Sequence, residues 1–192
     1  MRKAERRRQA INSATLRPKT AVILGTASCV FDDIDQLNNL IHNREDYIVL
    51  SVNFATILPV KPNYIVGIHG DYIDTYKAVA QIKAEEFGWA KDFYTVSYTG
   101  HADYIYPELE SEGTSGRFAI SVALEKLNCT KIILCGIPID GTKRFYGDIR
   151  HDYAKIKDNQ IWERIDPTKV RSFSGNTLKR YGAPTLEWLQ TH

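Results

Sequence analysis

Four short segments combine small residues with hydroxyl, amide or imidazole groups, where apolar runs end or helical patterns begin. They are Gly25-Thr26-Ala27-Ser28, Val52-Asn53, Ile68-His69-Gly70-Asp71 and Gly113-Thr114-Ser115-Gly116. Free backbone N–H groups at the start of a helix suit a phosphate group. The first and fourth segments are therefore candidate anion-binding loops, built on Gly25, Thr26 and Ser28 and on Thr114, Ser115 and Gly116. An ordinary tight turn and a Ser/Thr helix cap explain the same residues.

Asn53 and two histidines add polar side chains. The Asn53 amide offers two donors and an acceptor, which suits a ribose, a sugar or a base edge, although Asn is also a common turn residue. His69 follows an apolar run, and His151 lies between Arg150 and Asp152. An imidazole changes charge near neutral pH, so both histidines are candidate catalytic acids or bases. A structural hydrogen bond for His69 and a surface position for His151 are the alternatives.

A second Ser/Gly turn occurs near the carboxyl end, with Ser172, Ser174 and Gly175 before a possible helix. It is a candidate lid or second anion contact, and a plain capped turn explains it equally well. The sequence contains no HExxH motif, no Cys/His cluster and no repeated DxD acids. We therefore expect no dedicated metal site, and no cofactor other than a nucleotide-type ligand.

The elements that must position these residues are visible as apolar runs and helical patterns. Buried strands are expected near residues 21–25, 47–52, 64–68 and 131–136, and a further strand near 93–98. Helices are expected to start at Asp32 or Asp33, to run from Asp71 to Phe87, closed by Gly88, and from Ser115 to Leu127. Strands that are continuously apolar and alternate with helices indicate a parallel sheet covered on both faces.

This pattern predicts an α/β protein: a Rossmann-like three-layer domain with a mostly parallel central sheet. Ligands of such sheets collect beyond the carboxyl ends of the strands. We therefore expect Ser28, Asn53, His69 and Ser115 to converge on one cleft. Residues 20–192 are expected to form a single domain, and its polar and aromatic part from about residue 141 is expected to form a helical appendage packed over the strand ends.

The amino-terminal segment, residues 1–19, is expected to be a basic arm or helix. It carries seven Lys and Arg residues and one acid, whereas the net charge of the whole chain is only +2. Through residues 2–8 it could make a weak contact with nucleic acid or an acidic partner, and a solvated arm is the alternative. No stretch reaches the roughly 20 apolar residues of a membrane span, so none is expected.

The order of these motifs resembles a family of phage and prophage proteins that are often labelled morphogenetic. The resemblance covers about residues 20–190, and the block VRSFSGNT followed by GAPTLEWL is its most specific part. The central blocks GTAS, VN, IHGD and GTSGRFAISVALEKLNCTKIILCGIPID are also similar to a wider superfamily. That superfamily includes bacterial sialyltransferase-like enzymes and MptE-like pterin pyrophosphokinases, although the first loop, GTAS, departs from their GxGxS-like loop.

The resemblance implies a nucleotide or nucleotide-sugar pocket at Gly25, Thr26, Ser28, Asn53, Ser115 and Gly116. It also implies a place in the cytoplasm of a bacterial host or in the virion. The first functional hypothesis is a glycosyltransferase-like enzyme that needs no metal ion. The second is a virion assembly protein on a degenerate nucleotide-binding fold, with other virion proteins as partners. The third is a nucleotide-binding protein without turnover.

Overall fold

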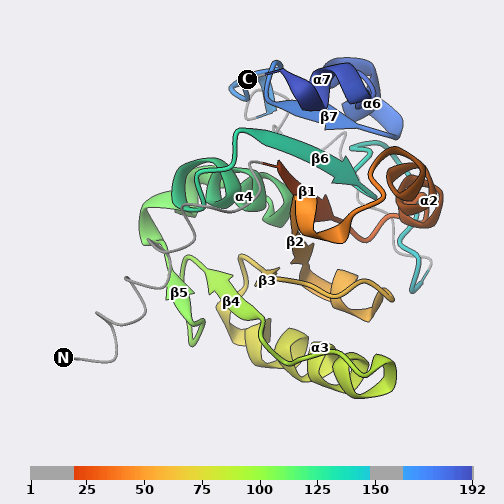
Figure 1. The fold of residues 1–192 in the computed structure, drawn as a ribbon. Coiled ribbons are helices and arrows are strands. Elements are labelled where there is room, and N and C mark those ends of the chain that lie inside the picture. Colours follow the sequence, from red (N-terminus) through yellow and green to blue (C-terminus); the bar gives the residue numbers. More distant parts are fainter. Residues whose placement is uncertain (1–19, 148–161, 192) are drawn as a thin grey trace.

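The computed structural model describes residues 20–147 and 162–191 of the 192-residue chain (Figure 1). The predicted basic arm, with its residues 2–8, and the candidate base His151 lie outside the described residues.

The described residues form a seven-stranded sheet in the order β5-β4-β3-β2-β1-β6-β7, in which every pair of neighbouring strands is parallel. The strands are β1 (Thr20–Leu24), β2 (Tyr47–Val52), β3 (Tyr64–Val66), β4 (Tyr94–Ser97), β5 (Tyr104–Ile105), β6 (Lys131–Cys135) and β7 (Val170–Ser172). The four strands expected from apolar runs are thus neighbours in one parallel sheet. The predicted Rossmann-like α/β fold is confirmed.

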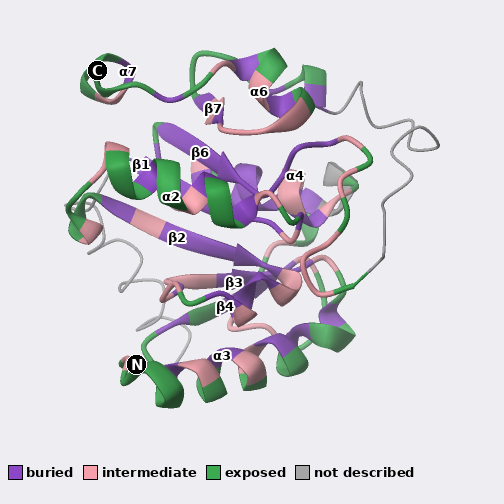
Figure 2. Cartoon of the chain, turned by 90° about the vertical axis from the view of Figure 1, so that its right-hand side faces the viewer, coloured by how far each residue is buried: buried purple, intermediate pink, exposed green. Residues whose placement is uncertain are grey.

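Both faces of the sheet are covered, because successive side chains of a strand point to opposite faces. On β1, Ile23 packs with Phe118 and Ile120 on one face, whereas Leu24 packs with Leu37 on the other. Figure 1 shows α4 (Ser115–Ser121) on one side of the sheet and α2 (Val30–Leu40) on the other. Figure 2 shows the strands buried between helices whose outer surfaces are exposed.

Among the described helices, three lie between successive strands (β1 and β2, β3 and β4, β5 and β6), and two follow β7. They are α2 (Val30–Leu40), α3 (Ile73–Phe87), α4 (Ser115–Ser121), α6 (Gly175–Tyr181) and α7 (Leu186–Gln190). A π-helical turn, Val122–Lys126, continues α4 toward β6, and short 3-10 turns lie at Arg44–Asp46, Asn53–Ile57, Gly70–Tyr72 and Pro107–Glu112. None of the described helices is long and apolar enough to cross a bilayer.

The predicted starts of two helices were wrong. α2 begins at Val30, after Cys29, which makes no side-chain cap. Asp33 lies inside the first turn instead, because its carboxylate is buried and hydrogen-bonded to the neighbouring loop. α3 begins at Ile73 because the residues around Asp71 form a 3-10 turn. Gly88 does close α3, in the left-handed conformation, as predicted.

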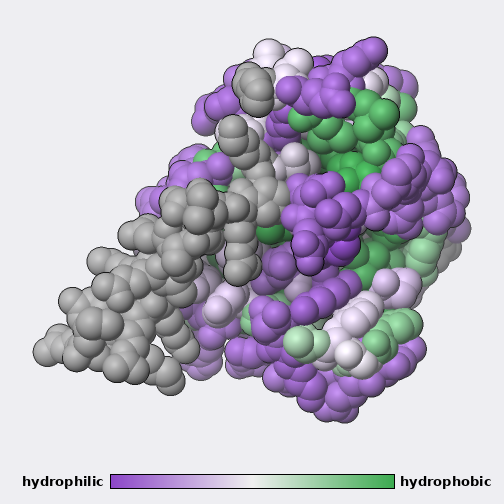
Figure 3. Space-filling model, viewed as in Figure 1, coloured by the Kyte–Doolittle hydropathy of each residue, from purple (hydrophilic) through white to green (hydrophobic). Residues whose placement is uncertain are grey.

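The carboxyl-terminal segment does more than pack over the strand ends. Val170–Ser172 pairs in parallel with β6 and extends the sheet as β7. Three residues with a single apolar side chain give no recognisable strand pattern, which is why the sequence did not predict it. Trp188 of α7 then packs into the α2 face of the core. Figure 3 shows a largely hydrophilic surface, with apolar side chains gathered between α7 and α2.

Candidate functional site

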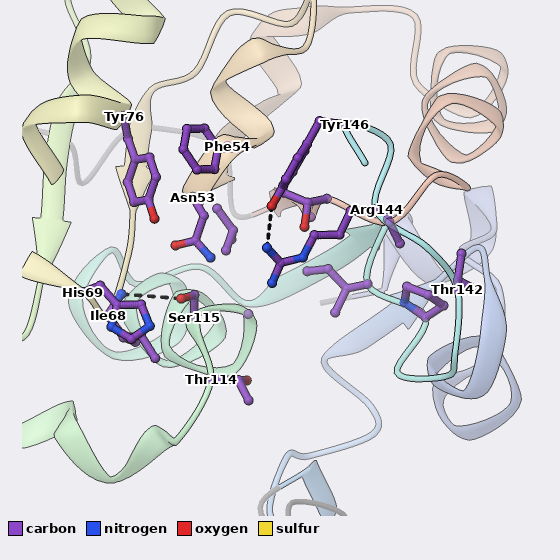
Figure 4. Close-up of a pocket in the computed structure, with 18 of the residues that line it drawn as sticks. Asn53, Phe54, Ile68, His69, Tyr76, Thr114, Ser115, Thr142, Arg144 and Tyr146 are labelled. Carbon is purple, nitrogen blue, oxygen red and sulfur yellow. Dashed lines mark hydrogen bonds between the residues drawn. The ribbon is translucent and has the colours of Figure 1, made fainter. Parts of the chain in front are cut away.

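A cavity of about 560 Å³ lies at the carboxyl edge of the sheet. The chain adds strands outward from β1 through β5 and then returns to place β6 on the other side of β1. The loops that follow β1 and β6 diverge at this switch point, where ligands of open α/β sheets bind. The segments after β1, β2, β3 and β6 and the start of α4 all line the cavity (Figure 4).

Two glycines allow the loops after β1 and β6 to approach closely. The Gly25 N–H donates to the Cys135 carbonyl at 2.8 Å. A Cβ atom on Gly25 would lie 2.2 Å from the Gly136 carbonyl oxygen. Gly136 has φ +67°, and a Cβ there would lie 2.6 Å from Cβ of Val30. Side chains at either position would push the two loops apart and open the wall of the cavity.

The first loop does not offer the phosphate cradle that the sequence suggested. Besides Gly25, the N–H of Ala27 donates to Gly136 O at 3.2 Å and the N–H of Ser28 donates to Lys143 O at 2.8 Å. These donors are satisfied by the loop after β6. Gly25 and Thr26 line the cavity, whereas Ser28 does not. The loop therefore contributes a wall of small residues.

Asn53 lies in the cavity wall at the end of β2, as expected. Its φ is +53°, a left-handed conformation that Asn tolerates better than most residues. Its buried Oδ1 has no hydrogen-bond partner among the described residues. A buried oxygen without a partner costs roughly 1–3 kcal/mol.

Thr114, Ser115 and Gly116 form the wall at the start of α4. The Thr114 hydroxyl accepts a hydrogen bond from the Arg117 N–H at 3.2 Å, so the predicted cap is present. The Ser115 hydroxyl accepts one from the Ile68 N–H at 3.5 Å, which joins α4 to the end of β3 (Figure 4). The positive end of α4 therefore faces the cavity.

His69 lies at the cavity rim, after β3, and is exposed to solvent. The structure thus brings Asn53, His69 and Ser115 to one cavity, whereas Ser28 is left outside it. An exposed imidazole at the mouth of a cavity can take a proton from a ligand and release it to water.

Arg144 and four aromatic residues of the lining, Phe54, Tyr76, Tyr146 and Trp162, were not predicted as site residues. Arg144 lines the cavity, and its guanidinium donates to the Tyr146 hydroxyl at 2.6 Å. Phe54 and Tyr76 line the same side (Figure 4). The sequence gives little indication of Arg144 as a site residue. Its loop is brought to the cavity by an isolated bridge with the distant Ala27, and such a contact leaves no local sequence pattern. The described lining residues include the cation Arg144 and no Asp or Glu.

Ser172, Ser174 and Gly175 do not face the cavity. Ser172 is fully buried, and its hydroxyl lies 2.8 Å from that of Thr177. Gly175 has φ +62° and packs so closely on Pro138 that a Cβ would lie 2.3 Å from Pro138 Cβ. The structure therefore assigns these residues neither a lid position nor a direct anion contact.

The Ser/Gly turn instead supports the loop after β6. The Asn176 N–H donates to Pro138 O at 2.7 Å, and its Nδ2 donates to Ile139 O at 2.8 Å. The Thr177 hydroxyl donates to Ile137 O at 2.7 Å. Ile137 and Pro138 line the cavity, so the carboxyl-terminal segment fixes its floor from behind.

Asp33 joins the same support from α2. Its Oδ2 accepts hydrogen bonds from the Gly136 N–H at 2.7 Å and from the Ser174 hydroxyl at 2.8 Å. Burial raises the pKa of the Asp33 carboxyl above its ordinary value, despite these two hydrogen bonds. Burial also raises the pKa of the adjacent Cys29 thiol to about 11, which leaves little of the nucleophilic thiolate near neutral pH.

Among the described residues, no group of three or more His, Cys, Asp or Glu side chains is placed to hold a metal ion. No family model, curated protein or solved structure significantly matches the chain.

Proposed function

We propose that the protein binds a nucleotide or nucleotide sugar in the cavity and transfers a glycosyl group from it. The observation that carries this proposal is the position of the cavity in the sheet together with the charged and polar groups that line it. The cavity lies at the switch point of a parallel sheet, and its described lining includes Arg144 and the start of α4 but no carboxylate. A positive site of this kind favours a phosphate-bearing ligand.

The size and lining of the cavity support a ligand as large as a nucleotide. A volume of about 560 Å³ falls within the range of small-molecule sites, roughly 300–1,000 Å³. Phe54 and Tyr76 offer aromatic surface for a base or a ribose, and the Asn53 amide can hydrogen-bond a sugar or a base edge. In this proposal, Arg144 and the Thr114–Gly116 segment contact the phosphate groups.

The proposed reaction uses His69 as the general base. The oxygen of an acceptor hydroxyl bonds to the anomeric carbon of the donor sugar, and the bond from that carbon to the phosphate oxygen breaks. The nucleotide leaves with the electron pair, and Arg144 and the amino end of α4 stabilise its negative charge. His69 takes the hydroxyl proton. In this proposal, protein groups supply the positive charge that a metal ion supplies in other transferases.

A thermal-shift panel of nucleotides and nucleotide sugars tests the proposal. A ligand at about 100 times its dissociation constant adds roughly 2.7 kcal/mol to the free energy of unfolding. For a domain of this size that raises Tm by roughly 5–10 °C. Arg144→Gln should reduce the shift, whereas Arg180→Gln, which removes a cation of α6 outside the cavity lining, should leave it unchanged.

His69→Asn should keep the shift and lose turnover, because a general base acts mainly on the transition state. If no compound of the panel raises Tm at millimolar concentration, nucleotide binding is contradicted. A virion assembly role on a degenerate fold then becomes the better hypothesis.

A further inference from the structure

Seven aromatic rings form an unbroken chain of contacts along one side of the cavity and beyond it. In order, the contacts join Phe31 to Phe145, Phe145 to Tyr146, Tyr146 to Phe54, Phe54 to Tyr76, Tyr76 to Tyr72, and Tyr72 to His69. Neighbouring ring centroids lie between 5.0 and 6.4 Å apart. The rings come from the loops after β2, β3 and β6 and from the amino-terminal parts of α2 and α3.

The series of rings includes residues outside the cavity lining. Phe54, Tyr76, Tyr146 and His69 line the cavity (Figure 4). Phe31 and Phe145, at one end of the series, do not, and neither does Tyr72, which lies between Tyr76 and His69. Phe31 and Tyr72 are 48% and 51% exposed. Exposed aromatic rings that continue a ligand cavity mark a binding surface more often than scattered apolar residues do. Their flat faces pack well against the C–H faces of sugar rings and against bases.

The charges beside Phe31 and Tyr72 distinguish between these ligands. Asp32 follows Phe31, and Asp71 precedes Tyr72; both carboxylates are exposed. Asp74, in the first turn of α3, is exposed as well, and its Oδ2 lies 3.9 Å from His101 Nδ1. Carboxylates beside Phe31 and Tyr72 repel a phosphate backbone, and they accept hydrogen bonds from sugar hydroxyls. The cation Arg144 lies instead beside Tyr146, in the middle of the series of rings.

We propose that the rings beyond the cavity bind a neutral oligosaccharide, with Tyr72 and Phe31 as its exposed stacking platforms. As the acceptor site of a transfer reaction, this inference rests on the proposed function. It adds the acceptor class to that function: a sugar chain without phosphate, whose reacting hydroxyl reaches the cavity past His69. Single-stranded nucleic acid is the competing ligand, since bases also stack on aromatic rings.

A glycan array probed with the full chain tests this inference. The array carries neutral and charged oligosaccharides, and a (dT)12 oligonucleotide is titrated in parallel. We expect neutral glycans to bind. For the strongest of them, Tyr72→Ala or Phe31→Ala should weaken binding at least tenfold. Phe87→Ala, which removes a 43% exposed ring of α3 outside this chain of contacts, should leave binding unchanged.

The same variants are also titrated with nucleotides, so that a failure of the glycan proposal can be distinguished from a failure of the proposed function. Nucleotide affinity should survive both substitutions, because Phe31 and Tyr72 do not line the cavity. The inference is overturned if no neutral glycan binds, if (dT)12 binds more tightly than every neutral glycan, or if Phe87→Ala weakens binding as much as Tyr72→Ala does. If the unaltered protein binds no nucleotide, the proposed function is contradicted instead.

Discussion

The carboxylate of Asp33 accepts the backbone N–H of Gly136 at 2.7 Å, across 103 residues of sequence. This hydrogen bond joins the first turn of α2 to the loop that forms the cavity floor. Ser174 donates to the same oxygen, so two donors depend on one buried carboxylate. Asp33→Ala should lower the free energy of unfolding by about 2–4 kcal/mol, because both donors lose their acceptor. Asp33→Asn keeps an acceptor oxygen and should cost less, and urea titrations compare the two. If both variants lose the same unfolding free energy, the acceptor oxygen at position 33 does not contribute to stability.

The raised pKa of Asp33 makes a prediction about pH. Burial disfavours the charged carboxylate, so the folded state holds the proton at a higher pH than the unfolded state does. The stability contributed by Asp33 is therefore fully present below the ordinary pKa of about 3.9 and falls as pH rises through the raised folded value. Relative to Asp33→Asn, the unaltered protein should lose unfolding free energy over that window. If the unaltered protein instead gains unfolding free energy relative to Asp33→Asn as pH rises through that window, the assignment is contradicted.

Gly25 and Gly141 form a matched pair for testing the close approach at the switch point. A Cβ on Gly25 would collide with the Gly136 carbonyl at 2.2 Å, whereas a Cβ on Gly141 would meet nothing within 4 Å. Gly25→Ala should lower the unfolding free energy by about 2 kcal/mol or more. Gly141→Ala should be neutral or slightly stabilising, since it restricts the unfolded chain. If both variants have the same Tm, the two loops are not as close as described.

Thr177→Val tests whether the carboxyl-terminal segment supports the cavity floor. The substitution preserves shape but removes the hydroxyl that donates to Ile137 O in a buried setting. We expect a loss of about 1–3 kcal/mol in unfolding free energy. Thr168→Val, at an exposed turn, serves as the control and should change little. If the Thr177→Val protein is as stable as this control, the carboxyl-terminal segment does not support the cavity floor through Thr177.

The sequence predicted the centre of the sheet well and its edges poorly. After their first residues, Thr20 and Lys131, β1 and β6 are continuously apolar because helices cover both of their faces, and that pattern is recognisable in the sequence alone. β5 and β7 contain two and three residues, too few to show any period. Their place in the sheet is decided by pairing with distant strands.

The candidate site was predicted only in part, for a similar reason. Asn53, His69 and Ser115 follow strand ends or open a helix, and the parallel sheet brings them together. The N–H of Ser28 is instead satisfied by the carbonyl of Lys143, a contact between segments far apart in sequence. Such long-range pairing leaves no local pattern. The same pairing brings Arg144 to the cavity, so one unpredicted contact changed both the donors and the charge of the site.

Both proposals depend on the claim that the cavity binds a nucleotide. Its most direct test is an NMR titration of the ¹⁵N-labelled protein with AMP, CMP, UDP and GDP. At least one of them should shift the amide signals of Asn53, His69, Thr114–Gly116 and Arg144, and leave the outer face of α3 unchanged. Gly116→Leu, whose side chain would extend toward Ile137 and Trp162 in the lining, should abolish these shifts in a folded protein. Absent shifts with all four nucleotides, or shifts confined to residues outside the cavity, would contradict the claim.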